Sequence, residues 1–211
     1  MKKRFYLVLT FILLVIFSIF VASAHHEKTS KLHKTTSPVQ LLSDKSIVRG
    51  ARSTLVRNNE KISMHINTNG LKLGTATTIW WVIFNHPEKC KHPEGKFRCG
   101  PKDLKIEGGD PAIKSSVLYA AGNVIRENGK GSYGAMLMVN DTKGALFGPG
   151  LTNPHGVDVH LIVRSHGSLI KGLVKEMIST FGAGCKNIPS GTGTQGPNTC
   201  EDLQFSVHET I

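Results

Sequence analysis

Apolar and polar residues alternate in short segments over most of the chain, with the two-residue period of a β-strand. In residues 61–68, Ile62, Met64 and Ile66 alternate with polar neighbours, which predicts a strand with one buried face. Residues 76–84 (ATTIWWVIF) are β-branched or aromatic and become apolar on both faces, which predicts a central strand. Further strands are predicted over residues 116–125, 132–139, 157–164 and 203–208.

One later segment has a helical period instead. Its apolar residues recur every three or four positions, which predicts a short amphipathic helix that ends at Gly182. These residues are Ile170, Leu173, Val174, Met177, Ile178 and Phe181. Together the elements predict an all-β fold, an antiparallel two-sheet β-sandwich (immunoglobulin-like or Greek-key) with one short helix and disulfide-stapled loops.

The N-terminus has the order of a secretory signal peptide. Residues 2–4 are basic, residues 5–21 are apolar, and Ala-Ser-Ala follows at 22–24. We therefore expect a signal peptide over residues 1–24 and a secreted or periplasmic mature protein that begins at His25. An uncleaved membrane anchor is the alternative, because the apolar run approaches the ~18 residues of a spanning helix. Without that anchor, no membrane span is expected in the mature form.

A polar segment separates the expected signal from the expected domain. Residues 25–49 are rich in Lys, His, Ser and Thr and contain few large apolar groups, so they can bury little surface. We expect a flexible basic leader there and the β-sandwich domain over residues 50–211.

The chain is basic, with a formal net charge of +11, and loss of the three basic residues at 2–4 leaves +8. The Lys and Arg residues are scattered rather than clustered and interleaved with aromatics, which argues against nucleic acid as a partner. A carbohydrate, an envelope component or a protein is the expected kind of partner.

Four cysteines in an exported chain predict two disulfides. Cys90 and Cys99 enclose one segment with turn residues, and Cys185 and Cys200 enclose another, so two local bridges are expected. The other connectivities and a four-cysteine zinc site are the alternatives. Zinc thiolate sites usually contain CxxC pairs, and neither pair here has that spacing.

The richest group of polar residues lies in the predicted strand at 157–164 and just after it. Asp158, His160, Arg164 and His166 would share one face of an extended chain, where they could bind an anion or a metal. A solvent-facing strand in which Arg164 pairs with a carboxylate is the alternative.

A binding set of Asp158, His160, Arg164, His166 and His208 is the resulting prediction. No catalytic residue is predicted, because no GxSxG or HExxH pattern occurs. The expected function is a non-catalytic exported binding module without a cofactor. The alternative is a copper or zinc protein that uses His160, His166 and His208.

Several segments resemble those of a set of uncharacterised exported bacterial β-sandwich proteins. They are 80–85 (WWVIFN), 116–122 (SVLYAAG), 144–150 (GALFGPG), 159–167 (VHLIVRSHG) and 204–208 (QFSVH). The resemblance covers about residues 50–208, and no activity is attached to that set, so it implies no catalytic residue. The pattern is also loosely similar to chordin-like and copper/zinc superoxide dismutase domains, but the dismutases' metal-binding histidine spacing is not present.

Overall fold

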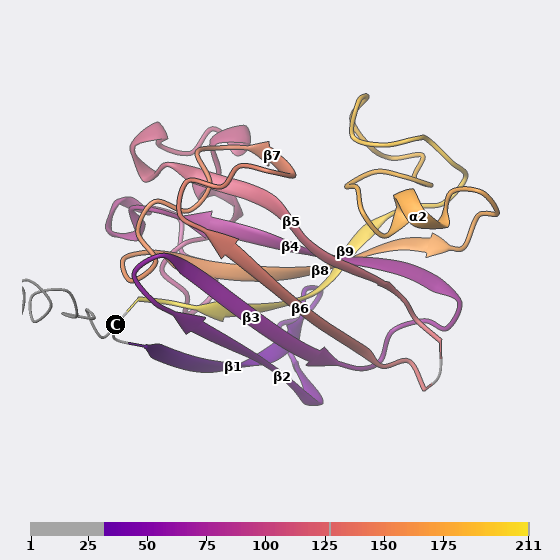
Figure 1. Cartoon of the computed structure of the whole chain (residues 1–211), viewed down its shortest axis with the longest axis horizontal. Coiled ribbons are helices and arrows are strands. Elements are labelled where there is room, and N and C mark those ends of the chain that lie inside the picture. The colour runs from indigo at the N-terminus through magenta and orange to yellow at the C-terminus, as the bar shows by residue number, and fades with distance from the viewer. Residues whose placement is uncertain (1–31, 127, 211) are drawn as a thin grey trace, which may run out of the picture. The chain divides into compact units, whose positions relative to one another are not determined.

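The computed structural model describes residues 32–126 and 128–210, which form a mostly β structure (Figure 1). The strands are β1 (His33–Leu41), β2 (Ile47–Arg57), β3 (Lys61–Thr68), β4 (Thr75–Phe84), β5 (Ser115–Val124), β6 (Gly131–Met138), β7 (Ala145–Phe147), β8 (Asp158–Ser168) and β9 (Glu201–His208). The short helices are η1 (Pro87–Lys89), η2 (Pro101–Asp103), η3 (Lys105–Glu107), η4 (Pro111–Ile113) and α2 (Val174–Met177). Every strand predicted from the alternating pattern is confirmed, to within a few residues.

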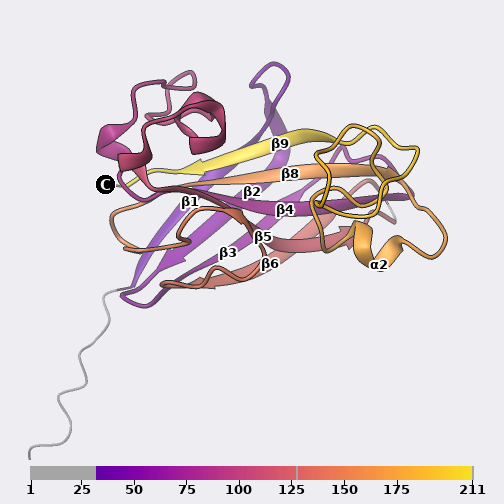
Figure 2. The same cartoon turned by 90° about the horizontal axis from the view of Figure 1, so that it is seen from above.

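All nine described strands belong to one antiparallel sheet, in the order β6-β3-β2-β1-β9-β8-β4-β5-β7. The sheet curls until β5 and β6 contact each other, which gives a half-barrel (Figures 1 and 2). The expected two-sheet sandwich is therefore not confirmed. A short pairing between β1 and β9, at Gln40 and Leu41, joins the strands β6-β3-β2-β1 to the strands β9-β8-β4-β5-β7 in a single sheet.

The inside of the curled sheet holds the main apolar core. Alternate residues of each strand point inward, as in Ile79, Trp81 and Ile83 of β4, which pack with Leu161 of β8. The residues between them point outward. All ten residues of β4 are buried, because two long loop segments cover its outer face. β4 is thus the central strand that its composition predicts.

Each covering segment carries one disulfide. The segment between β4 and β5 contains the four short 3-10 helices and the Cys90–Cys99 bridge, and the segment between β8 and β9 contains α2 and the Cys185–Cys200 bridge. The expected local pairing is confirmed. The two views place these segments toward opposite ends of the strands (Figures 1 and 2).

The expected flexible leader over 25–49 is wrong from residue 33 onward. β1 lies inside the sheet between β2 and β9, and β2 begins at Ile47, so the domain begins before residue 50. The pattern does not indicate β1 because small hydroxyl residues occupy two of its inward positions, and Val39 is its only fully buried apolar residue. Ser37 is 8% exposed, and Thr35 Oγ1 forms a hydrogen bond of 2.8 Å with His208 Nδ1. The predicted signal peptide and residues 25–31 lie outside the described residues.

Two smaller expectations also change. The helix expected around 170–181 is a single turn, α2, whose buried Met177 packs against Ala76 and Ala183. Residues 145–147, for which the alternating pattern predicts no strand, form the edge strand β7. None of the helices in the described ranges is long and apolar enough to cross a membrane.

Candidate functional site

A cavity of about 310 Å³ lies over the outer face of the sheet, between the covering segments. β4, β5 and β8 form its floor, with the side chains of Trp80, Val82, Phe84, Val117, His160 and Ile162. Its walls come from the turns around η2 and η3, from β7, and from Phe181 in the segment that contains α2. The alternation of β4 explains the floor, because the residues that point away from the core are themselves apolar.

The floor contains one titratable ring among the described residues, that of His160. The side chain is 8% exposed, and its Nε2 atom has no hydrogen-bond partner. The ring of Phe84 packs edge-on against it with 5.0 Å between centroids, and Phe97 lies 6.3 Å away. Burial, and then the nearby His208, lower the pKa of His160 from 6.5 to about 4. The ring is therefore neutral near pH 7 and has an unused hydrogen-bonding atom.

One end of the cavity is held by a charged pair. Arg164 Nη1 donates a hydrogen bond of 2.8 Å to Asp202 Oδ1, and Arg164 Nε donates one of 3.1 Å to the main-chain oxygen of Phe181. The guanidinium carbon also lies 4.0 Å from the centre of the Phe181 ring. Arg164 therefore positions the wall of the cavity. Its pairing with a carboxylate agrees with the alternative prediction for this strand, in which Arg164 forms an ion pair. The strand, however, is buried rather than solvent-facing.

Two apolar side chains at the cavity are exposed. Ile106, beside η3, is 64% exposed, and Leu146 of β7 is 38% exposed, and both line the cavity. Exposed apolar side chains around a concave site are typical of places where an apolar ligand enters. The mouth thus combines these apolar side chains with the exposed carboxylates of Glu107 and Asp202.

The other predicted site residues have structural partners. Asp158 is fully buried and accepts a hydrogen bond of 2.6 Å from the main-chain N–H of Thr210, with Arg98 Nε 3.9 Å away. Burial raises its pKa. His166 is also fully buried: Nε2 bonds with Thr78 Oγ1 at 2.9 Å, and Nδ1 lies 3.0 Å from the oxygen of Ala183.

The structure does not bring His160, His166 and His208 together. His160 and His166 both lie on the outer face of β8, but six positions of extended chain separate them by about 20 Å. His208 pairs with Val159 and lies on the inner face, where it bonds with Ser53 Oγ at 2.8 Å. The structure therefore does not assemble the three-histidine metal site that was the alternative hypothesis.

Two other groups of possible ligand atoms are close together: His166 with Cys185 and Cys200, and Asp103 with Cys90 and Cys99. In both groups the sulfurs form a disulfide and are not thiolates. Asp103 is already occupied by main-chain N–H groups, including that of Gly100 at 3.0 Å. These groups hold the covering segments in place.

The described lining of the cavity combines apolar side chains with the imidazole of His160 and the carboxylates of Glu107 and Asp202. Within the described ranges, no Ser, Thr, Cys or Lys side chain lines it. The sequence singled out His160 but not Leu104 or Ile106, because nothing in the pattern shows which loop residues fold over β4. Compared with known proteins, the chain matches no family model, no curated protein and no solved structure.

Proposed function

We propose that the protein is an exported binding protein that takes one small apolar molecule with a single hydrogen-bonding group in the cavity over β4 and β8. The observation that carries this proposal is that His160 lines an otherwise apolar floor while its buried Nε2 atom has no hydrogen-bond partner among the described residues. A buried polar atom without a partner costs about 1–3 kcal/mol. A ligand hydroxyl or carbonyl that bonds to it would recover much of that cost.

The size of the cavity supports a small ligand. Its volume of about 310 Å³ is at the lower end of the ~300–1,000 Å³ typical of ligand sites. It is also about twice the ~150 Å³ cavity that accepts benzene in another protein. A bicyclic aromatic molecule or a short branched chain therefore fits the available space.

Export is part of the proposal and rests on two features. The N-terminus has the residue order of a signal peptide. Both pairs of cysteines form disulfides, which persist in oxidising compartments. Mass spectrometry of the secreted form tests this part, and a chain that keeps residues 1–24 in the cytoplasm would contradict it.

The binding test compares two probes of the same shape. Isothermal titration with 2-naphthol and with naphthalene should show tighter binding of 2-naphthol, by about 3–10-fold, because one hydrogen bond contributes about 0.5–1.5 kcal/mol. His160→Phe should bind both probes equally well, whereas His155→Gln, at an exposed histidine, should keep the wild-type preference.

A second variant locates the probes. Val82→Trp places a large ring on the cavity floor and should abolish binding of both probes. Two results would refute the proposal: neither probe binds to the wild-type protein, or both bind as tightly to Val82→Trp as to the wild type.

A further inference from the structure

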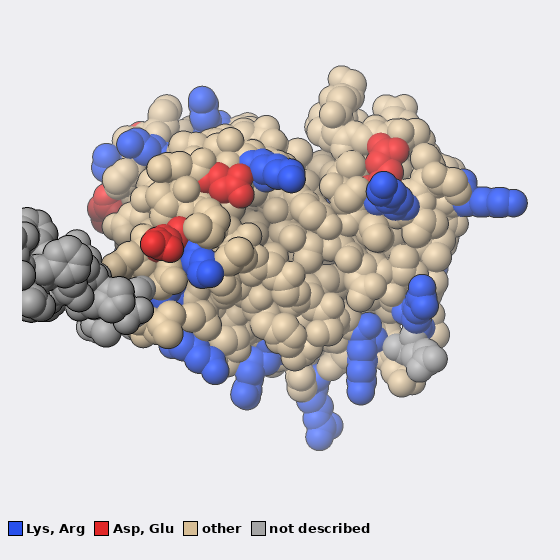
Figure 3. Space-filling view, in the orientation of Figure 1, with Lys and Arg blue, Asp and Glu red and all other residues tan. Residues whose placement is uncertain are grey.

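Basic side chains gather at one edge of the molecule, away from the cavity. Figure 3 shows Lys and Arg without Asp or Glu along the lower edge of the view, where Figure 1 places β1 and β2, whereas in the upper half Lys and Arg lie beside Asp and Glu. Arg49 and Arg52 of β2 are exposed, as is Lys130 just before β6. Clustered charges of one sign raise the local concentration of ligands of the opposite sign.

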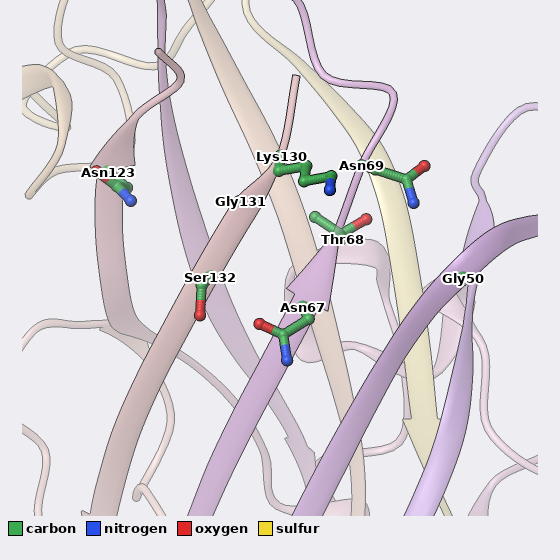
Figure 4. A pocket seen from close by; sticks show the side chains of 8 residues that line it. All are labelled: Gly50, Asn67, Thr68, Asn69, Asn123, Lys130, Gly131 and Ser132. Carbon is green, nitrogen blue, oxygen red and sulfur yellow. The ribbon is translucent and has the colours of Figure 1, made fainter. Parts of the chain in front are cut away.

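A polar hollow of about 600 Å³ lies beside these basic residues, across the ends of β3 and β6 (Figure 4). Its lining residues are Gly50, Asn67, Thr68, Asn69, Asn123, Lys130, Gly131 and Ser132. Apart from the two glycines, each of them offers an amide, a hydroxyl or an ammonium group. None of these described lining residues is acidic, apolar or aromatic.

The strand pairing arranges these groups as a row. Asn67 of β3 pairs with Ser132 of β6 on one side and with Arg52 of β2 on the other, so the three lie side by side. Two strand spacings of about 4.8 Å, from β2 across β3 to β6, make this row about 10 Å long. That length suits a short stretch of a chain-like ligand rather than a single ion.

Lys130 supplies the cation of the hollow, and hydrogen bonds position its polar neighbours: Asn67 Nδ2 and Ser132 Oγ lie 3.4 and 3.3 Å from the ring nitrogens of His65. Lys130 extends from β6 toward Thr68 (Figure 4) and forms no ion pair with any described residue. Asn69 is held in place, because its Nδ2 donates a hydrogen bond of 2.8 Å to the main-chain oxygen of Arg49. Gly50 keeps the side next to Asn69 open: a Cβ there would meet only Asn69 Nδ2, at 3.8 Å.

We propose that this hollow binds an acidic polysaccharide, with Lys130 and Arg52 contacting its anionic groups and Asn67, Asn123 and Ser132 contacting its hydroxyls. Amide and hydroxyl side chains can both donate to and accept from sugar hydroxyls, and the cations supply the attraction for acidic groups. A single-stranded nucleic acid fits less well, because the described lining has no aromatic ring on which a base can stack.

The first test measures binding of the whole mature protein to immobilised alginate (carboxylate), dextran sulfate (sulfate) and neutral dextran at low salt. Alginate, dextran sulfate or both should bind, and which of them binds identifies the anionic group. Neutral dextran should not bind, and binding should weaken when the salt concentration rises. Equal binding of neutral dextran, or equally tight binding of a single-stranded oligonucleotide, would overturn the proposal.

The second test separates the hollow from the overall charge. Arg52→Gln with Lys130→Gln should weaken binding of the acidic glycan at least tenfold, whereas Lys175→Gln with Lys186→Gln, far away in the segment of α2, should weaken it less than twofold. Asn67→Leu should also weaken it, although the charge is unchanged.

Equal losses in the two double variants, or an unchanged affinity in Asn67→Leu, would mean that net charge alone attracts the glycan, and would overturn the proposal. All of these variants should bind 2-naphthol as the wild type does. The experiments therefore distinguish failure of the proposed ligand binding in the cavity from failure of the proposed polysaccharide binding in the hollow.

Discussion

Acidification should destabilise the protein through His208, whose ring is 2% exposed on the inner face of the sheet. Its Nδ1 atom bonds with Thr35 Oγ1 and its Nε2 atom with Ser53 Oγ, both at 2.8 Å. Burial, and then the nearby Arg57, lower the pKa of His208 from 6.5 to about 4. Neither hydroxyl can neutralise a charge on the ring, so the folded state resists its protonation.

The sign of the effect follows from the two pKa values. Because the folded value lies below the unfolded one, the unfolded chain takes up the proton first as the pH falls. The contribution to stability is complete above pH 6.5 and is lost as the pH falls to about 4. At ~1.4 kcal/mol per pH unit, the full loss is about 3 kcal/mol. Between pH 7 and pH 4.5 the loss from His208 is about 2 kcal/mol.

The assay is urea unfolding at pH 7 and at pH 4.5, for the wild type, His208→Gln and the exposed-site control His155→Gln. Burial also lowers the pKa values of His160 and His166, so these residues add to the stability lost on acidification. The pKa of Asp158 is raised, so this residue offsets part of that loss. These effects cancel in the comparison between variants. The pH-dependent loss should be about 2 kcal/mol smaller in His208→Gln than in the wild type or the control. An equal loss in all three proteins would refute the reasoning.

Two further substitutions test how the sheet is closed and covered. Arg57→Met should lower the free energy of unfolding by about 3 kcal/mol or more in urea titrations, because it leaves three buried carbonyl groups without a donor. A loss below about 1 kcal/mol would contradict this prediction. The acceptors of Arg57 are the main-chain oxygens of Pro154, Val157 and His208, at 2.8, 2.8 and 2.9 Å. Gly122→Ala would place a Cβ 1.8 Å from the main-chain oxygen of Ile178, so the segment of α2 should move outward. The control is Gly134→Ala, whose Cβ would meet only an oxygen at 3.8 Å. Gly122→Ala should have a lower Tm and faster limited proteolysis than this control. An unchanged Tm and proteolysis rate would show that the segment does not pack on β5 as described.

The sequence predicted most of the strands whose inward residues are large and apolar, such as Ile62 and Met64 in β3, but not β2. It also did not predict β1, in which Ser37 and the partly buried Thr35 occupy inward positions and only Val39 is a fully buried apolar residue. Composition alone cannot distinguish such a strand from a solvated leader, because the partner that makes it a strand lies far away in the chain. His208, the partner of Thr35, is 173 positions further on.

The candidate site was only partly predictable for a similar reason. The alternating pattern correctly identified His160 as an outward residue of β8, and the turn residues around the cysteines correctly indicated two local disulfides. The burial of His160 depends on Phe84 and Phe97, which reach it from a different strand and from a loop. No local pattern in the sequence indicates these contacts.

Local alternation, which depends on neighbours two residues apart, determined six strands and the apolar outer face of β4. The six strands are β3, β4, β5, β6, β8 and β9. Cysteine spacing determined the two bridges. Only the tertiary structure decided the register of β8 against β9, which puts Val159 opposite His208 and so separates the three histidines onto two faces. It also decided the β1–β9 pairing that makes one curled sheet. Both features depend on the free energy of contacts between distant segments, and a one-residue change of register would move every side chain to the other face.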